Sequence, residues 1–319
     1  MYLIGLDIGG TKCAVVSASL NDGDMPEIFD KISFSTAECN GWQGVFEKFF
    51  ESIDNLKIRY PDRRFDAVGI SCGGPLDSVS GVIKRPPNLP DWDNVPICKI
   101  FSDRYGIPVF LQNDANACAV AEWKFGAGKG YRNMVFLTFG TGMGAGLILD
   151  NRLYSGTNDM AGEVGHIRLA SDGPVGYGKN GSFEGFCSGG GIERLARSMY
   201  DKTHPQTVLT TDDMSAKAVA VAAKNGDEFS ISVYDKCAEM LGRGLSVIID
   251  IINPQAIVIG SIYERSGDLL KDRMMQIIKE EALPLSYSVC EILPAQLSDT
   301  IGDYAAIGVA VAGLEALNG

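Results

Sequence analysis

The chain has 319 residues, of which 45% are hydrophobic and 21% are charged. This length and composition allow two α/β cores of roughly 150 residues each without metals or disulfides. The formal net charge is −12, which disfavours sequence-independent binding to nucleic acid or to an anionic membrane surface. We therefore expect neither nucleic acid nor a membrane as a partner.

The eight cysteines are scattered and never form a Cys-x-x-Cys pair. This distribution is typical of free thiols in a reducing compartment rather than of a secreted disulfide framework. The N-terminal segment MYLIGLDIGG lacks the basic region and the cleavage site of a signal peptide. An apolar run at 245–259 is interrupted by Asp250, Asn253 and Pro254, so it is too short to span a membrane. The chain is expected to be cytoplasmic.

The first third of the chain predicts one α/β unit. Its opening is a strand, a tight glycine turn and a second strand, and a later stretch repeats apolar residues at helical spacing. The expected elements, in chain order, are strands at 2–7, 13–18 and 28–34, a helix at 41–57, a strand at 65–72, a helix near 95–105 and a strand at 108–111.

The pattern of strand, glycine turn and returning strand then occurs a second time, which predicts an internally duplicated α/β fold. Two unrelated glycine-rich hairpins would be the alternative explanation. The expected elements of this second unit are strands at 134–139 and 147–149, a hairpin at 150–156, a helix at 228–252, a strand at 256–259, a helix at 268–281 and an amphipathic tail helix at 303–317.

The segment DIGGTK after the first strand has the composition of a phosphate-binding turn. Gly9 and Gly10 would let backbone N–H groups approach phosphate closely, Thr11 adds a hydroxyl donor and Lys12 adds positive charge. Asp7 at the strand end could hold Mg²⁺ through water, since Mg²⁺ keeps several waters and few carboxylates. An ordinary hairpin with exposed polar residues is the alternative.

A second glycine-rich turn, FGTGMGAG, lies between two apolar strands. We expect Thr141, Gly142 and Gly144 to contact phosphate, so that two turns clamp a triphosphate from two sides. Neither turn matches the P-loop pattern or the dinucleotide-binding pattern. The sequence therefore predicts a nucleotide site of another type.

The segment QNDANA follows an apolar strand and opens a helix. Catalytic groups in α/β folds often lie at such strand ends, and a helix N-terminus favours the ionised form of Asp114. Asp114 is therefore our candidate for a base that accepts a proton from a hydroxyl group. Helix capping by Asn or Asp is the structural alternative.

The segment AGEVGH places a carboxylate beside one of the two histidines of the chain. Glu163 and His166 are three residues apart and could both hydrogen-bond one polyol. His204 lies in a polar loop and is expected to be solvated. A structural histidine in a loop is the alternative for His166.

Together these segments resemble the ROK family of sugar kinases and sugar-responsive repressors. The resemblance rests on LDIGGTK, PNLPDW at 87–92, NDANA, GTGMGAG, AGEVGH and GSFE, which occur in the family's order over essentially the whole chain. It implies an actin-like, hexokinase-type α/β fold with two ribonuclease-H-like domains around a central cleft. The implied domains are 1–115 plus 303–319, and 116–302.

The resemblance also implies roles for individual residues. It implies ATP and Mg²⁺ as cofactors, domain closure, and Asp114 as the general base for a primary hydroxyl, with O6 the expected one. Gly260 and Ser261 would contact the nucleotide, with Tyr263 near the base. The implied sugar-binding residues are Gly74, Asn88, Asn113, Glu163, His166 and Glu184.

One departure from the family pattern is large. Three cysteines of C-x-C-G-x-x-G-C-x-E normally bind structural zinc together with a histidine, but Val175, Tyr177 and Ser182 stand in their place. A single histidine cannot hold structural zinc, which takes four N or S ligands. We therefore expect no zinc site, and we expect Tyr177 and Phe183 to order this loop by packing. The departure also weakens any transfer of sugar specificity.

The leading interpretation is an ATP:hexose phosphotransferase, with glucose as the first choice of sugar and an N-acetylhexosamine or fructose next. Sugar-responsive repressors of the family carry an N-terminal helix-turn-helix, whereas this chain begins at its first strand, which disfavours that alternative. A non-catalytic sugar sensor is the third interpretation. The family habit also suggests a homodimer.

Overall fold

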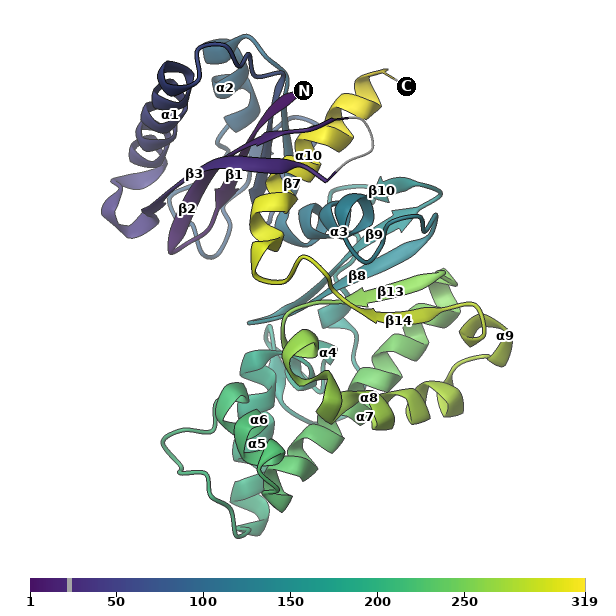
Figure 1. The fold of residues 1–319 in the computed structure, drawn as a ribbon. Helices are drawn as coiled ribbons and strands as arrows, with labels where there is room; N and C mark the ends of the chain where they lie inside the picture. Colours follow the sequence, from purple (N-terminus) through teal and green to yellow (C-terminus); the bar gives the residue numbers. More distant parts are fainter. Residues whose placement is uncertain (22–24, 319) are drawn as a thin grey trace.

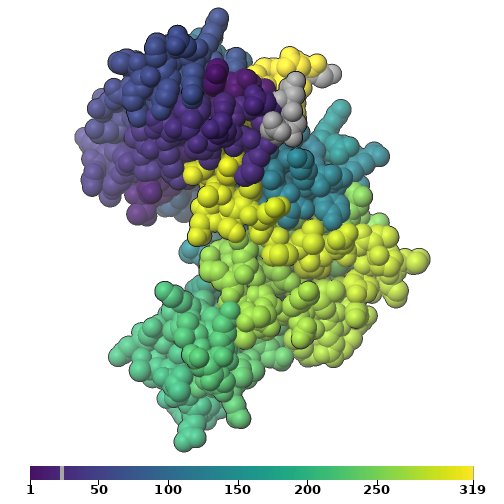
Figure 2. Space-filling view, viewed as in Figure 1, coloured from purple at the N-terminus to yellow at the C-terminus, as the bar shows by residue number. Residues whose placement is uncertain are grey.

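The computed structural model describes residues 1–21 and 25–318. The chain folds into two α/β halves, each built on a five-stranded sheet, and the long C-terminal helix lies between them (Figure 1). Figure 2 shows the surface narrowing between the upper half, drawn in purple and blue, and the lower half, drawn largely in green.

The N-terminal sheet has the strand order β3-β2-β1-β4-β7. Its first three strands form an antiparallel meander, and β4 and β7 continue the sheet in parallel with β1. The strands are β1 (Tyr2–Ile8), β2 (Lys12–Ser19), β3 (Glu27–Ser35), β4 (Ala67–Cys72) and β7 (Val109–Asn113). A small hairpin of β5 (Leu76–Asp77) and β6 (Val82–Ile83) leaves this sheet after β4.

Helices cover both faces of this sheet. On one face, α1 (Gly41–Arg59) buries Val45, Phe49 and Ile53, spaced four residues apart, and α2 (Ile97–Tyr105) packs beside it. On the other face lies α10 (Ile301–Asn318). Its close approach depends on Gly69, because a Cβ there would collide with the backbone of α10.

The second sheet has the order β10-β9-β8-β13-β14, which repeats the topology of the first sheet. A meander of three antiparallel strands is again extended by two parallel strands. The strands are β8 (Met134–Phe139), β9 (Met143–Leu149), β10 (Arg152–Tyr154), β13 (Ala256–Ile259) and β14 (Glu291–Pro294). The repeated topology confirms the predicted fold class of two ribonuclease-H-like units.

The helices of the second half gather on the side of its sheet away from the N-terminal half (Figure 1), except α3, which packs between β9 and α10. They are α3 (Asp114–Phe125), α4 (Phe183–Phe186), α5 (Gly189–Thr203), α6 (Ala216–Lys224), α7 (Glu228–Ile252), α8 (Ile262–Glu281) and α9 (Pro284–Tyr287). The second half also contains a hairpin of β11 (Val175–Gly176) and β12 (Lys179–Asn180) and the 3₁₀ turn η2 (Val164–His166). The 3₁₀ turn η1 (Thr36–Glu38) follows β3 in the N-terminal half, and η3 (Ser298–Thr300) precedes α10.

Several elements differ from the sequence-based expectation, and α6 and β14 were not predicted. The strand expected at 147–149 begins at Met143, because the last glycines of the turn pair in the ladder. The helix expected at 268–281 begins at Ile262, and Ser266 has non-helical dihedral angles that interrupt the periodicity. Helix α5 was not predicted, because its first turn is glycine-rich; the cap by Ser188 and packing of α5 compensate.

The boundaries between the two domains remain a prediction. Helix α10 begins at Ile301 and packs on the first sheet and on α3, so we keep 1–115 plus 303–319 as the proposed first domain and 116–302 as the second. Among the described residues, 298–318 is the one helical segment long and apolar enough to span a membrane by composition. Its apolar character is explained by residues 305–311, which are buried between the first sheet and α3.

Candidate active site

The two glycine turns occupy equivalent positions in the two sheets, after β1 and after β8. In the first turn, the N–H of Gly9 donates to the carbonyl oxygen of Lys12 at 3.1 Å, and the carbonyl oxygen of Gly9 accepts from the Thr36 hydroxyl at 2.7 Å. A Cβ on Gly10 would lie 2.7 Å from the carbonyl oxygen of Asn88. The turn is therefore packed directly against a predicted sugar-site residue, while Thr11 remains exposed.

Asp7, at the end of β1, lies in an environment rich in negative charge. The pKa of Asp7 is raised to about 6, first by burial and then by the carboxylates of Asp303 and Asp114, while Lys31 and Lys12 lower it by less. Sequence reasoning missed Asp303, whose carboxylate accepts a hydrogen bond from Lys31 Nζ at 2.7 Å. The signal for it was weak, because a lone acidic residue in the first turn of a helix usually only complements the helix dipole.

This surplus of negative charge fits a divalent cation. A cation held at Asp7 would relieve the repulsion among the carboxylates, and Mg²⁺ is satisfied with one carboxylate and several waters. Within 1–21 and 25–318, no group of three or more Cys, His, Asp or Glu side chains is arranged to enclose a metal ion. An ion at Asp7 would therefore rely on water and on substrate oxygens for most of its ligands.

Asp114 and Asn113 divide two roles at the start of α3. The side-chain oxygen of Asn113 accepts from the N–H of Asn116 at 2.8 Å, so Asn113 is the helix cap. Asp114 Oδ1 accepts from the N–H of Ala115 at 2.8 Å, and the residue is exposed to solvent. The capping alternative therefore applies to Asn113 rather than to Asp114.

The ionisation of Asp114 differs from the sequence-based expectation. Although water reaches the side chain, the surrounding protein atoms desolvate the carboxylate, and this desolvation raises the pKa of Asp114. The hydrogen bond from the N–H of Ala115 lowers it by less. The helix N-terminus is thus not the dominant effect, and a raised pKa makes Asp114 a stronger base when it is ionised.

Glu163 and His166 lie on one short segment ending in η2. Desolvation raises the pKa of Glu163 first of all, the charges of Asp114 and Glu184 raise it too, and His166 lowers it. Because the charges of Asp114, Glu184 and His166 all influence the pKa of Glu163, these four side chains lie near one another, as expected for parts of one site.

Glu184 lies in α4, which begins after the cap Ser182. Its Oε2 accepts a hydrogen bond from the N–H of Met143 at 3.1 Å. A Cβ on Gly142 would be only 2.9 Å from the same oxygen. A predicted sugar-site residue therefore contacts the second glycine turn, as Asn88 contacts the first.

The remaining predicted residues lie near these groups. Asn88 is exposed and packs against Gly73, next to Gly74, whose Cβ position is open space. In the second turn, the N–H of Gly144 donates to the Thr138 hydroxyl at 2.9 Å, so this group is engaged within the fold. Thr141 is exposed.

A cavity of about 750 Å³ opens beside the second glycine turn. Residues of this turn and of the four helices α5, α6, α7 and α8 form its wall. The lining includes Gly140, Thr141, Gly189, Gly190, Glu193, Ser215, Lys217, Lys224, Tyr234, Ser261, Ile262 and Arg265. Its size suits a nucleoside, and its position beside Thr141 makes it the candidate site for the adenosine part of ATP.

Tyr263, which we expected near the base, is only 5% exposed and belongs to the core. Tyr234 and Ile262 line the cavity instead. Ser261 lies at the cavity with an unusual φ of +61°, and its N–H donates to Glu264 Oε1 at 2.5 Å. Gly260 precedes it, and its Cβ position lies 3.3 Å from Phe136 in the core.

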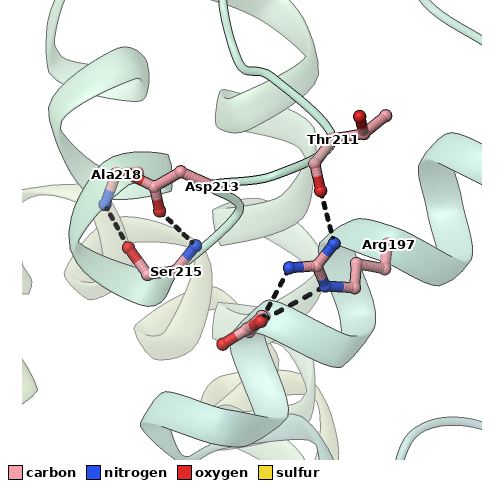
Figure 3. A network of polar contacts seen from close by, with 6 residues as sticks. Arg197, Thr211, Asp213, Ser215 and Ala218 are labelled. Carbon is pink, nitrogen blue, oxygen red and sulfur yellow. Dashed lines mark hydrogen bonds and ion pairs between the residues drawn. The ribbon is translucent and has the colours of Figure 1, made fainter.

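One wall of the cavity is ordered by the polar network in Figure 3. Arg197 Nη1 donates to the carbonyl oxygen of Thr211 at 2.7 Å, and its Nη2 donates to Glu193 at 2.9 Å. Ser215 donates its N–H to Asp213 and accepts from the N–H of Ala218. The contacts hold the loop before α6 against α5.

Sequence reasoning also missed the start of α5. The hydroxyl of Ser188 caps this helix by accepting from the N–H of Gly191 at 2.9 Å, and Gly189 and Gly190 line the cavity. A serine followed by three glycines at the start of a helix is a signal that could have indicated close contact with a ligand.

A larger cavity of about 850 Å³ lies elsewhere, between β7, α3, β10 and α10. None of the predicted site residues lines it. We therefore place the candidate active site at the two glycine turns and Asp114 rather than in this larger cavity.

The family model for the ROK family matches residues 3–312. The chain belongs to the ROK family. A glucokinase from Thermotoga maritima is 32% identical over 311 residues, which cover 95% of each chain. A ROK family glucokinase from Streptomyces griseus, solved in complex with glucose and AMPPNP, superposes with a TM-score of 0.72 at 29% identity, covering 98% of this chain and 99% of that one.

The ROK family also contains regulators. A xylose repressor from Caldicellulosiruptor bescii is 29% identical over 307 residues, which cover 93% of this chain and 75% of the repressor. Membership of the family therefore confirms the resemblance and the fold, while the choice between kinase and regulator depends on the site.

Proposed function

We propose that this protein is an ATP-dependent sugar kinase that phosphorylates a hexose at its 6-hydroxyl, with glucose as the first choice. The observation that carries the proposal is a pair of contacts. Gly10 of the first turn packs against Asn88, and Gly142 of the second turn packs against Glu184. Two phosphate-binding turns are thus each in contact with a sugar-site residue, as transfer between the two substrates requires.

In the proposed reaction, Asp114 accepts the proton of the sugar hydroxyl while the hydroxyl oxygen of the sugar forms a bond to the γ-phosphorus. The bond between the γ-phosphorus and the bridging oxygen breaks, and ADP leaves with that oxygen. The raised pKa of Asp114 supports the role of base. Thr11 and Thr141, which are both exposed, are proposed to donate hydrogen bonds to the phosphoryl oxygens, and Mg²⁺ at Asp7 would supply further positive charge there.

Asn113, Glu163, His166 and Glu184 are proposed to hold the sugar. Asn113 uses its side-chain oxygen as a helix cap, so its amide nitrogen is the atom left to donate to a sugar oxygen. An N-acetylhexosamine and fructose remain the alternative substrates, because a few hydrogen bonds decide among hexoses.

A sugar-responsive regulator is the second candidate function, favoured by the similarity to the xylose repressor. We prefer the kinase because Asp114 and both glycine turns are present together with a nucleoside-sized cavity. The net charge of −12 also disfavours DNA as a partner. We further propose that the protein is a cytoplasmic homodimer and that its partner is a small-molecule sugar.

The test is a coupled assay of ADP release with MgATP and glucose, fructose, mannose, allose, N-acetylglucosamine or N-acetylmannosamine. Glucose should raise turnover furthest above the rate with ATP alone, and ³¹P NMR should locate the phosphate on O6. If no sugar raises ADP release above that background, the kinase proposal fails.

A further inference from the structure

The hairpin of β11 and β12 occupies the stretch where the family pattern leads one to expect zinc ligands. Gly176 pairs with Lys179, so Tyr177 and Gly178 alone form its loop. Their φ angles are +45° and +75°, as in the type I′ turn that suits two-residue hairpins. Gly, Asn and Asp are the usual residues at such positions, so a tyrosine at the first one carries a conformational cost.

The side chain of Tyr177 contacts His166. The two ring centroids are 4.9 Å apart, and the rings meet edge to face at 74°, an arrangement that aromatic pairs favour. Tyr177 is 71% exposed, so burial in a hydrophobic core does not account for the residue. Its edge-to-face contact with the imidazole contributes favourable energy against the cost of the turn.

The same hairpin also holds the backbone of His166. Lys179 Nζ donates to the carbonyl oxygen of His166 at 2.7 Å. Further along, the Arg168 side chain donates to the carbonyl oxygen of Asn180 at 2.9 Å. The N–H of Leu169 donates to the carbonyl oxygen of Gly181 at 2.8 Å. The hairpin therefore fastens the whole segment that follows His166.

We propose that Tyr177 and Lys179 are positioning residues for sugar binding. The Tyr177 ring sets the orientation of the His166 imidazole, and Lys179 sets the position of its backbone. An imidazole that is already oriented loses less conformational freedom when a sugar binds. An aromatic contact and an ammonium–carbonyl hydrogen bond thus do in this chain what a metal brace does elsewhere. The inference rests on the proposed function, in which His166 binds the sugar.

The decisive variant is Tyr177→Asn, because Asn-Gly is the favoured sequence of a type I′ turn. This substitution keeps or strengthens the hairpin and removes only the ring. We expect the KM for the sugar to rise about tenfold, with the KM for ATP and the melting temperature nearly unchanged. Tyr177→Phe keeps the ring and should retain the wild-type KM. Tyr154→Asn, which replaces another exposed tyrosine, is the matched control.

A second readout needs no turnover. The chain has two histidines, so its ¹H–¹³C NMR spectrum should contain two imidazole Cε1–H signals. The variant His204→Gln removes one of them and thereby assigns both. Removing the ring current of Tyr177 should shift the His166 signal in Tyr177→Asn and leave it in place in Tyr154→Asn. An unshifted signal, or a sugar KM within twofold of wild type in Tyr177→Asn, overturns the role of Tyr177.

Lys179→Met tests the second contact, since it keeps the length of the side chain and removes the donor. The sugar KM should rise severalfold while the KM for ATP stays constant, and Lys202→Met on α5 serves as the control. An unchanged sugar KM in Lys179→Met overturns the role of Lys179. A wild-type protein inactive on every sugar would instead refute the kinase proposal, and the NMR comparison would still decide whether Tyr177 orients His166.

Discussion

Glu184 and Met143 join the predicted sugar site to the second glycine turn, because Glu184 Oε2 accepts the N–H of Met143 at 3.1 Å. Gly142 packs against the same carboxylate oxygen, with 2.9 Å between its Cβ position and that atom. A shift of this carboxylate would break its hydrogen bond to the N–H of Met143 in the turn. Binding of sugar and binding of phosphate should therefore depend on each other.

The substitution Gly142→Ala should disturb both substrates at once. The added methyl group would push against Glu184, so we expect kcat/KM to fall about 10- to 100-fold with raised KM values for sugar and for ATP. Steady-state kinetics with each substrate varied in turn measure this. Gly267→Ala in α8 is the control, since its Cβ position has no neighbour nearer than 3.9 Å. A change confined to one substrate would contradict the coupling.

The substitution Asp114→Asn tests the proposed base. The amide oxygen can still accept the N–H of Ala115, so α3 should form normally. Turnover should fall by about 10²- to 10⁴-fold, the usual contribution of general base catalysis, because an amide accepts no proton from the hydroxyl. Calorimetric titration with the sugar should give a dissociation constant close to that of the wild type. Turnover near the wild-type rate would remove Asp114 from the role of base.

Much of the fold could be predicted because its signals are local. Glycine turns after apolar strands marked the start of both meanders, and the periodic apolar residues of α7 marked a helix with the observed bounds, Glu228–Ile252. Helix α5 escaped prediction because its glycine-rich start lacks helical propensity and depends on the Ser188 cap. Ser266 has non-helical dihedral angles inside α8, and the predicted helix began only after this residue.

Residue type alone indicated Asp7, Asp114 and the two turns as candidates, and their roles remain predictions. Asp303 could not be found in this way, because it lies on α10, far along the chain from Asp7. Tyr263 shows the opposite error, since an aromatic residue after a glycine can equally be part of the core. The three-dimensional structure shows which residues lie close together, and residue type alone does not give this information.

The substitution Asp7→Asn should stabilise the protein while it impairs catalysis. The folded state raises the pKa of Asp7 from 3.8 to about 6. Between these values the folded chain keeps a proton that the unfolded chain has lost, so the contribution of Asp7 to stability falls as pH rises through this window. At pH 7.5 the ionised carboxylate costs up to about 3 kcal/mol, less where water screens it.

Unfolding by urea at two pH values measures this effect. At pH 7.5 Asp7→Asn should unfold at a higher urea concentration than the wild type, equivalent to about 1–3 kcal/mol. At pH 4 the two proteins should nearly coincide, because Asp7 is then mostly protonated. Asp150→Asn, at an exposed carboxylate paired with Arg132, is the control. A variant that is less stable at pH 7.5 would show that Asp7 is stabilising when ionised.

Zinc removal should have no effect on this protein. The positions of the family's three cysteines carry Val175, Tyr177 and Ser182, and the buried hydroxyl of Ser182 already caps α4 by accepting from the N–H of Gly185 at 3.1 Å. Metal analysis of the purified protein should find no stoichiometric zinc. Treatment with EDTA, followed by dialysis, should leave the melting temperature unchanged, and adding Mg²⁺ afterwards should restore full activity. One zinc per chain, or a lasting loss of stability after chelation, would mean that other ligands brace the loop that carries His166.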